Sequence, residues 1–307
     1  MIDLMSARLK NPFAFFAIAA AIVSCSRDPE RVTVRNVESL IRDNHLQAAM
    51  QTTDAYLKQH PDAVDLLRLR VIIALKADQL DFAATALHAL PPGDRVVAQA
   101  LSHRDMVVRT NAARLIDECS IAVEPQLLIR GLRDPVPSVR RYCARVLGES
   151  RQPVAVKPLF HLLQDDNWYV RAEAASALGQ IGDPRAAGWL ARLLSDSDGF
   201  VRYSAATALR EVACAENREV LLTFFRQAKG ERQLNIAVAL AKLAEPAALG
   251  SLTNAITDDN ADVRRRVAEA LGDYGRSAAT NALELLLNDS DPKVREQAKH
   301  SLSQTRG

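Results

Sequence analysis

The sequence predicts an all-α fold, a right-handed α–α superhelix in which short helix pairs stack on one another as a solenoid. Apolar residues recur with a period of 31 residues through the C-terminal two thirds of the 307-residue chain. Hydrophobic residues make up 48% of the chain and charged residues 25%, which is typical of a folded protein. Aromatic residues make up only 5%, whereas alanine and leucine are abundant, and this balance favours closely packed helices over a β-sandwich.

Two columns of leucines define the repeat, and within each column successive leucines are 31 residues apart. The first column is Leu128, Leu159, Leu190, Leu221, Leu252 and Leu283, and the second is Leu147, Leu178, Leu209, Leu240, Leu271 and Leu302. Seven units run from about residue 94 to residue 305. Each unit is expected to form two helices, because its apolar residues are spaced three or four apart both before and after a polar turn such as Asp165-Asp166-Asn167.

Stacking of the units follows from their composition. One helix pair could not bury both of its faces, so neighbouring pairs are expected to share one core. A column of small residues predicts close approach of neighbouring helices. It contains Gly148, Gly179 and Gly272, with Ala241 in the fifth unit. The last unit has Lys299, Ser301 and Ser303 where earlier units have two alanines and a glycine, which predicts a polar face that caps the stack.

Three phrases resemble HEAT-like repeats of the short type found in phycobilin lyases: DDNWYVRAEAASALGQIGDP (165–184), DSDGFVRYSAATALREV (196–212) and DSDPKVREQAKHSL (289–302). In that family a loop aspartate and a helix arginine join successive repeats by hydrogen bonds. The resemblance implies a structural ladder of Asp134, Asp165, Asp196, Asp258 and Asp289 with Arg140, Arg171, Arg202, Arg264 and Arg295. The fifth unit has Gln227 and Gln233 at these positions, so we expect a bend or soft point near residues 215–245.

Residues 36–92 do not follow the 31-residue repeat and are expected to form a separate helical segment. The turn Pro91-Pro92-Gly93 is expected to separate this segment from the repeat array, residues 93–307. The phrases NHLQAA (44–49) and DQLDFAA (78–84) resemble the second half of a tetratricopeptide repeat (TPR). This TPR-like resemblance implies four helices in two hairpins. The alternative is a generic helical cap on the first unit of the array.

The N-terminus resembles the signal peptide of bacterial lipoproteins. Arg8 and Lys10 precede the apolar run PFAFFAIAAAIV (12–23), which is too short to cross a bilayer core of about 30 Å. The run leads into Ile22-Val23-Ser24-Cys25, which is similar to a lipobox. The resemblance implies that residues 1–24 are removed, that Cys25 carries a diacylglycerol lipid and that residues 25–35 form a linker. Because Ser26 follows the cysteine, it also implies the periplasmic face of the outer membrane. The alternatives are an ordinary secretory signal and a fortuitously apolar N-terminus.

No motif in the sequence predicts catalysis. The six histidines form no H-E-x-x-H motif, and the chain contains no C-x-x-C, no phosphate-binding P-loop and no G-x-S-x-G. The pairs Asp165-Asp166 and Asp258-Asp259 occupy equivalent turns, so helix capping explains them better than acid–base chemistry. We therefore expect no catalytic residue, no metal and no cofactor. The net charge of +2 gives no electrostatic argument for a nucleic acid partner.

Aromatic residues provide the clearest candidate for a binding surface. Tyr169 and Phe200 share a column that contains Val107, Ser138, Asp262 and Lys293 in other units, so this column is expected to face solvent. The candidate partner-binding residues are Trp168, Tyr169, Phe200, Tyr203, Arg141 and Arg265. The alternative is that these rings pack on the loops between helices.

These features together predict a lipid-anchored scaffold or assembly factor that binds another protein of the bacterial cell envelope through the concave surface of the solenoid. Two alternatives remain. One is an enzyme of the lyase type, and the other is a protein that holds a small ligand or a peptidoglycan fragment in the concave groove.

Overall fold

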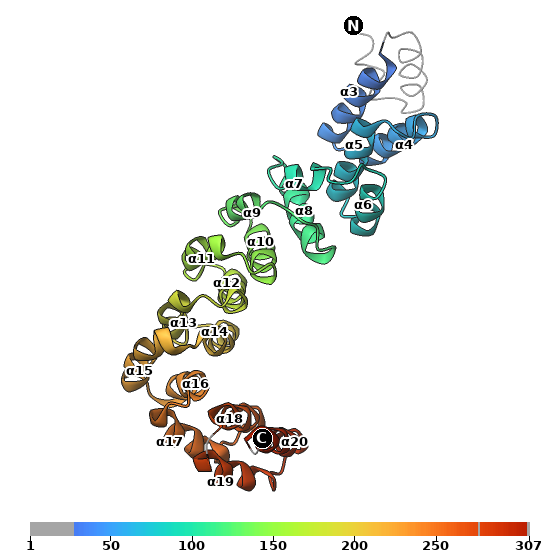
Figure 1. Cartoon of the computed structure of the whole chain (residues 1–307). Coiled ribbons are helices and arrows are strands. Elements are labelled where there is room, and N and C mark those ends of the chain that lie inside the picture. Colours follow the sequence, from blue (N-terminus) through green and yellow to red (C-terminus); the bar gives the residue numbers. More distant parts are fainter. Residues whose placement is uncertain (1–27, 276, 306–307) are drawn as a thin grey trace. The chain divides into compact units, whose positions relative to one another are not determined.

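The computed structural model describes residues 28–275 and 277–305, and within them it contains eighteen α-helices, four short 3-10 helices and no strand (Figure 1). The predicted all-α solenoid is therefore confirmed. The chain forms two compact units, Met1–Val123 and Glu124–Gly307. The predicted signal peptide and lipobox lie outside the described residues. Across the described ranges, no helix combines the length and the apolar character needed to span a bilayer.

The first unit begins with four helices, each of which packs on the next. They are α3 (Pro29–Arg42), α4 (Leu46–Leu57), α5 (Val64–Lys76) and α6 (Leu80–Leu87). Val37 and Val71 are fully buried in their core. Asn44 (φ 63°) and Asp78 (φ 57°) turn the chain after α3 and α5, in the left-handed region that asparagine and aspartate tolerate. The resemblance of these helices to tetratricopeptide repeats stays a prediction.

Helix α3 starts earlier than the sequence predicts. Residues 29–35 belong to this helix, so the predicted linker over residues 25–35 is wrong from Pro29 onward. Asp28 accepts a hydrogen bond from the N–H of Arg31 at 3.0 Å, and Pro29 occupies the first helical position, where a missing N–H costs little. Thr33 is buried in the second turn, so packing as well as capping holds this end of the helix.

Two further helices, α7 (Val96–Ala100) and α8 (Met106–Glu118), belong to the first compact unit. Helix α8 packs on α5, where buried Asn111 donates from Nδ2 to the carbonyl of Leu75 at 2.8 Å. Lys76 at the end of α5 lies 3.3 Å from Asp105, the residue that precedes α8. The boundary between the two compact units, after Val123, thus falls one repeat later than the boundary predicted between residues 92 and 93. The predicted boundary marks the start of the 31-residue register in the sequence.

The second unit contains six helix pairs within the described residues. They are α9 (Pro125–Gly131) with α10 (Pro137–Glu149), α11 (Val156–Leu162) with α12 (Trp168–Ile181), α13 (Ala187–Leu193) with α14 (Gly199–Val212), α15 (Arg218–Gln227) with α16 (Gly230–Ala241), α17 (Pro246–Asn254) with α18 (Ala261–Tyr274), and α19 (Ser277–Leu286) with α20 (Pro292–Thr305). The short 3-10 helices are η1 (Pro153–Ala155), η2 (Pro184–Ala186), η3 (Ala215–Asn217) and η4 (Ala255–Thr257). In Figure 1 the first helices of the pairs form one row and the second helices form another. Every leucine of the two sequence columns is at most 6% exposed.

Side-chain oxygens fix where several of the second helices begin. The residue before α12, α14, α18 and α20 accepts a hydrogen bond from the backbone N–H two positions later. These residues are Asn167, Asp198, Asn260 and Asp291. Two of the bonded N–H groups belong to Tyr169 and Phe200, so the caps also position two candidate binding residues.

The glycine column determines how closely the second helices pack. A Cβ on Gly179 would lie 2.8 Å from the Cα of Ala208, so the contact between α12 and α14 requires glycine. The same column continues with Arg210 and Ala241 before it returns to Gly272. The pairs α10–α12, α12–α14 and α18–α20 pack extensively, whereas α14–α16 and α16–α18 make much smaller contacts. The two column positions that are not glycine, Arg210 and Ala241, therefore coincide with the least extensive packing of second helices, which is that of α16 on α14 and on α18.

The predicted polar cap of the last unit is wrong at one residue. Lys299 and Ser303 are exposed, but Ser301 is 1% exposed. A Cβ on Gly272 would lie 2.7 Å from the Cβ of Ser301, so this serine faces the preceding helix pair. Its column contains the alanines that pack backward onto the glycine column, which explains why it stays buried at the last unit.

Candidate partner-binding groove

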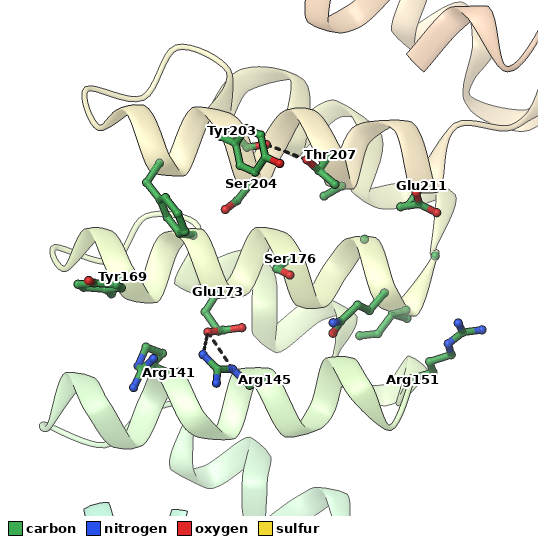
Figure 2. Close-up of a pocket in the computed structure, with 17 residues that line it drawn as sticks. Arg141, Arg145, Arg151, Tyr169, Glu173, Ser176, Tyr203, Ser204, Thr207 and Glu211 are labelled. Atoms are coloured by element: carbon green, nitrogen blue, oxygen red, sulfur yellow. Dashed lines mark hydrogen bonds and ion pairs between the residues drawn. The ribbon is translucent and has the colours of Figure 1, made fainter. Parts of the chain in front are cut away.

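An open groove of about 780 Å³ lies along α12, between α10 and α14 (Figure 2). Helix α12 contributes three small residues, Ala172, Ser176 and Gly179, between the arginines of α10 and the aromatic residues of α14. The groove exists because a helix with small side chains lies between two helices with large ones. All three helices are positioned by the buried leucine columns, so the groove is built on rigid elements of the array.

Four of the predicted binding residues form an aromatic cluster, defined here as Trp168, Tyr169, Phe200 and Tyr203. The Trp168 and Tyr169 rings stack with centroids 3.5 Å apart, and Trp168 meets Phe200 edge-on at 5.9 Å. Phe200 and Tyr203 follow at 6.5 Å. Tyr169 is 51% exposed and both Phe200 and Tyr203 are 56% exposed, whereas Trp168 is half-buried. The three exposed rings line the groove at the start of α12 and α14, and their binding role stays a prediction.

Arg141 joins the aromatic cluster from the neighbouring helix. Its guanidinium carbon lies 4.3 Å from the ring centroid of Tyr142 and 5.9 Å from that of Tyr169. Contact with the ring faces holds the guanidinium by cation–π attraction and leaves its N–H groups free to bond elsewhere. Arg141 also lines a smaller adjoining hollow of about 290 Å³ with Asn167 and Tyr169.

Arg265 stands apart from these residues. It lies on α18, its Nε is 3.8 Å from Oδ1 of Asp262, and it does not line the groove. The six residues predicted from sequence columns therefore do not form one surface. A shared column fixes the side of a helix on which a residue lies, but not its distance along the stack.

The sequence did not predict an ion pair that crosses the groove. Arg145 of α10 donates from Nη2 to Oε2 of Glu173 on α12 at 2.8 Å. Arg151, which follows α10 in a left-handed conformation (φ 48°), lines the groove near its other end. Neither side chain belongs to an unusual motif. The spacing of Arg141 and Arg145 on one face of α10 is the only sequence signal that points to this wall.

Within the described residues of the second unit, three bidentate rungs of the implied Asp–Arg ladder are formed. Arg140 binds Asp165 at 2.7 and 2.9 Å, Arg171 binds Asp196 at 2.8 and 2.9 Å, and Arg264 binds Asp289 at 2.7 and 2.9 Å. Each of these arginines also donates from Nη1 to a carbonyl of the loop before its own helix. The rungs therefore join two successive loops, and charge-assisted bidentate bonds of this kind are strong and directional.

The ladder is interrupted around α15 and α16. Arg202 donates to the carbonyl of Asp196 in its own loop at 2.9 Å, but within the described residues no rung joins it to the next loop, where Gln227 replaces aspartate. Within the described residues no ladder arginine binds Asp258 either, because Gln233 occupies the position of that arginine. Gln233 donates instead from Nε2 to the carbonyl of Phe225 at 3.3 Å. Asp134 accepts from the N–H of Val136, and Arg295 donates to the carbonyl of Asp289.

Burial and hydrogen bonds shift the pKa of several groups in the described part of the chain. Burial raises the pKa of the Cys143 thiol to about 12, so this thiol packs as an apolar side chain. The Arg264 side chain lowers the pKa of Asp289 through its hydrogen bonds. Over the same residues, no three side chains of histidine, cysteine, aspartate or glutamate lie together as a metal site requires.

Several solved structures resemble the chain at low identity. The complex of CpcE and CpcF of phycocyanin lyase from Nostoc sp. PCC7120 is 21% identical, covers 70% of this chain and 97% of its own, and has a TM-score of 0.45. Human deoxyhypusine hydroxylase in complex with glycerol is 22% identical, with 68% and 94% covered and a TM-score of 0.33. An engineered protein is 19% identical, with 99% and 94% covered and a TM-score of 0.49. Similarity at this level carries no argument about function.

No curated protein matches the chain. HEAT repeats, by contrast, match residues 125–210 and 219–303, which together make up more than half of the sequence. The two matched segments cover the six helix pairs of the second unit except for the last two residues of α14 and of α20 and the first residue of α15. The gap between the segments contains η3, beside the interruption of the ladder. The chain belongs to the HEAT-repeat family.

Proposed function

We propose that the chain is a protein-binding scaffold or assembly factor, held in the bacterial cell envelope by a lipid on Cys25. The groove along α12 is the observation that supports this proposal. Exposed aromatic residues and arginines are the side chains that contribute most to binding energy at protein interfaces. Tyr169, Phe200 and Tyr203 leave more than half of their surface exposed beside Arg141. An exposed apolar cluster of this kind marks an interaction site more often than an ordinary surface.

The envelope location is supported by sequence alone. Residues 12–23 are apolar and end directly before a Ser24-Cys25 pair, the pattern of a lipoprotein signal. A lipid on Cys25 would place the repeat array at the periplasmic face of the outer membrane. In that compartment a protein partner is a better expectation than a nucleic acid.

A second candidate function is the binding of a small ligand or a peptidoglycan fragment. It is favoured by the volume of the groove, about 780 Å³, since pockets for small molecules usually measure roughly 300–1,000 Å³. Ser176, Ser204 and Thr207 supply hydroxyl groups beside the aromatic rings, a mixture that also suits sugars.

The test is site-specific photocrosslinking in cells. In one variant a photoreactive amino acid replaces Thr207, an exposed groove residue of α14. In the matched control it replaces Leu285, which is 65% exposed on α19 outside the groove. We expect a single protein adduct from position 207, none from position 285, and loss of the adduct when Cys25→Ser removes the lipid. Failure to obtain an adduct at position 207 in a folded chain would contradict the scaffold proposal and favour the small-ligand alternative.

Membrane fractionation of the same strains tests the anchor separately. The wild-type chain should sediment with the outer membrane, and Cys25→Ser should release it into the soluble periplasmic fraction. An unchanged distribution would contradict lipidation at Cys25 without affecting the groove.

A further inference from the structure

We propose that the groove along α12 binds an extended acidic segment of the partner, with an apolar side chain of that segment resting on the aromatic cluster. This inference depends on the proposed function, since it specifies the chemistry of the partner at the same site. It rests on three features of the groove: its uncompensated positive charge, a pre-positioned arginine, and hydroxyl groups that an extended backbone could use.

The charge of the groove is unevenly compensated. Arg145 is neutralised by Glu173 at 2.8 Å. Within the described residues, Arg141 and Arg151 form no ion pair, and Figure 2 shows them at opposite ends of the groove. Glu211 also lines the Arg151 end, 3.9 Å from Arg210. The Arg141 end therefore carries the clearest positive charge, and a partner with carboxylate groups would complement it.

Arg141 is already in position for a carboxylate. Its guanidinium lies over the Tyr142 ring and near the Tyr169 ring, which limits the rotamer entropy lost on binding. A guanidinium held by its faces keeps its edge available, and two parallel N–H groups on that edge match the two oxygens of a carboxylate. The exposed Tyr169 ring lies 5.9 Å from this guanidinium and exposed Phe200 lines the same groove, so one ligand could contact the arginine and the rings together.

An extended segment fits the groove better than a helix. The Ser176 and Ser204 hydroxyls face the groove from α12 and α14 (Figure 2). A helix bonds its own backbone groups internally, whereas an extended chain leaves N–H and C=O groups that need partners. About one helical turn beyond Ser176, Gly179 packs directly on Ala208 of α14, so no side chain of α12 projects at that point.

The experiment is a display selection of random twelve-residue peptides on the purified full chain. We expect the enriched peptides to contain several aspartate or glutamate residues next to an aromatic or large aliphatic residue. The most enriched peptide, made with a fluorescent label, should bind about tenfold more weakly to Arg141→Gln. It should bind Arg226→Gln normally, because Arg226 is an exposed arginine of α15 outside the groove. Binding should also weaken as salt concentration rises.

Three outcomes would overturn the inference: enrichment of neutral or basic peptides, no enrichment at all, or an affinity that Arg141→Gln leaves unchanged. Thermal melting of each variant excludes loss of fold as the cause. If position 207 crosslinks a protein in cells while no acidic peptide is enriched, the acidic-segment inference fails and the scaffold proposal stands. If acidic peptides bind in vitro but position 207 gives no adduct in cells, the scaffold proposal fails instead.

Discussion

Arg210 of α14 binds Asp273 of α18, although the entire α15–α16 pair lies between them in the sequence. Its Nη2 and Nε donate to Oδ2 of Asp273 at 2.6 and 2.9 Å, and Nη2 lies 3.0 Å from Oε1 of Glu269. We call Arg210, Glu269 and Asp273 the clasp. The ladder is interrupted at the N-terminal ends of these second helices, and the clasp joins their C-terminal ends. It therefore links α14 to α18 where helix packing on α16 is least extensive.

Removing the clasp should loosen the array on both sides of α16. We expect Arg210→Gln to lower the free energy of unfolding by about 1 kcal/mol, a modest value because the side chain is partly exposed. Hydrogen exchange should become faster in α16 and α18 and stay unchanged in α12. Even in the wild type, amides of residues 215–245 should exchange faster than those of α12 and α14.

The matched control for the clasp is Arg185→Gln. Arg185 also binds an aspartate, but its partner Asp183 is two residues away, so this pair joins no separate helices. The control should leave exchange in α16 and α18 unchanged. Uniform protection across the second unit in the wild type would contradict the predicted soft point.

Restoring the missing rung should stabilise the array. Gln227 occupies the position of the ladder aspartate, and Arg202 donates to its own loop through Nη1 only. We expect Gln227→Asp to raise the free energy of unfolding by about 0.5–1 kcal/mol, through a rung like those of Arg140 and Arg171. Urea unfolding checks this value.

A double-mutant cycle shows whether the gain comes from the new rung. In an Arg202→Gln background, Gln227→Asp should give no gain. A gain that persists without Arg202 would mean that the aspartate acts through capping or surface charge and not through the ladder.

The repeat itself could be predicted from the sequence because its signals are local and periodic. The leucine columns are buried on the same face of every helix pair. Asn167 caps its helix by accepting a hydrogen bond from the backbone N–H two residues later. The Asp–Arg rungs followed from resemblance, and their 25-residue separation recurs at each intact rung. The aromatic cluster could be predicted from the sequence for the same reason, since Tyr169 and Phe200 occupy equivalent positions in adjacent units.

Contacts that depend on how far the stack curves could not be predicted in this way. Arg210 and Asp273 are 63 residues apart, and no repeat column pairs them. Arg210 occupies the glycine column, where its size is incompatible with the close packing seen at Gly179, so its side chain must lie elsewhere. Arg265 and Ser301 were misplaced because a column position does not state which neighbouring pair a side chain meets.

Substitution within the glycine column should be costly. A Cβ on Gly179 would lie 2.8 Å from both the Cα and the Cβ of Ala208, so Gly179→Ala should destabilise the chain by about 1–3 kcal/mol through overpacking. Gly250 of α17 is the matched control, because a Cβ there meets nothing within 4 Å. Gly250→Ala should stabilise the helix by up to about 1 kcal/mol. Equal effects in urea unfolding would contradict this account of the packing.

Acid should weaken the last rung of the ladder. The hydrogen bonds from Arg264 lower the folded-state pKa of Asp289, so the rung contributes its full stability above the unfolded pKa of about 3.9. The contribution is lost as pH falls through the lower, folded-state pKa. Asp289→Asn should therefore reduce stability at pH 6 and show a smaller further loss on acidification than the wild type. Parallel losses in both proteins between pH 5 and pH 2 would contradict this assignment.

Removing two rings of the aromatic cluster should abolish partner capture without unfolding the array. Tyr169 and Tyr203 are 51% and 56% exposed, so Tyr169→Ala with Tyr203→Ala leaves the buried leucine columns intact. Each ring that acts as an interface hot spot contributes about 2 kcal/mol or more to binding. Two such contributions amount to about 4 kcal/mol, so the double substitution should weaken partner binding by roughly several hundredfold and reduce the crosslink from position 207 accordingly at limiting partner concentration. The control is Val220→Ala, which removes an exposed apolar side chain of α15 outside the groove and should leave both the crosslink and the melting temperature unchanged. An unchanged crosslink in the double variant would show that the rings do not carry binding. A lower melting temperature would show instead that they pack structurally on the loops between helices.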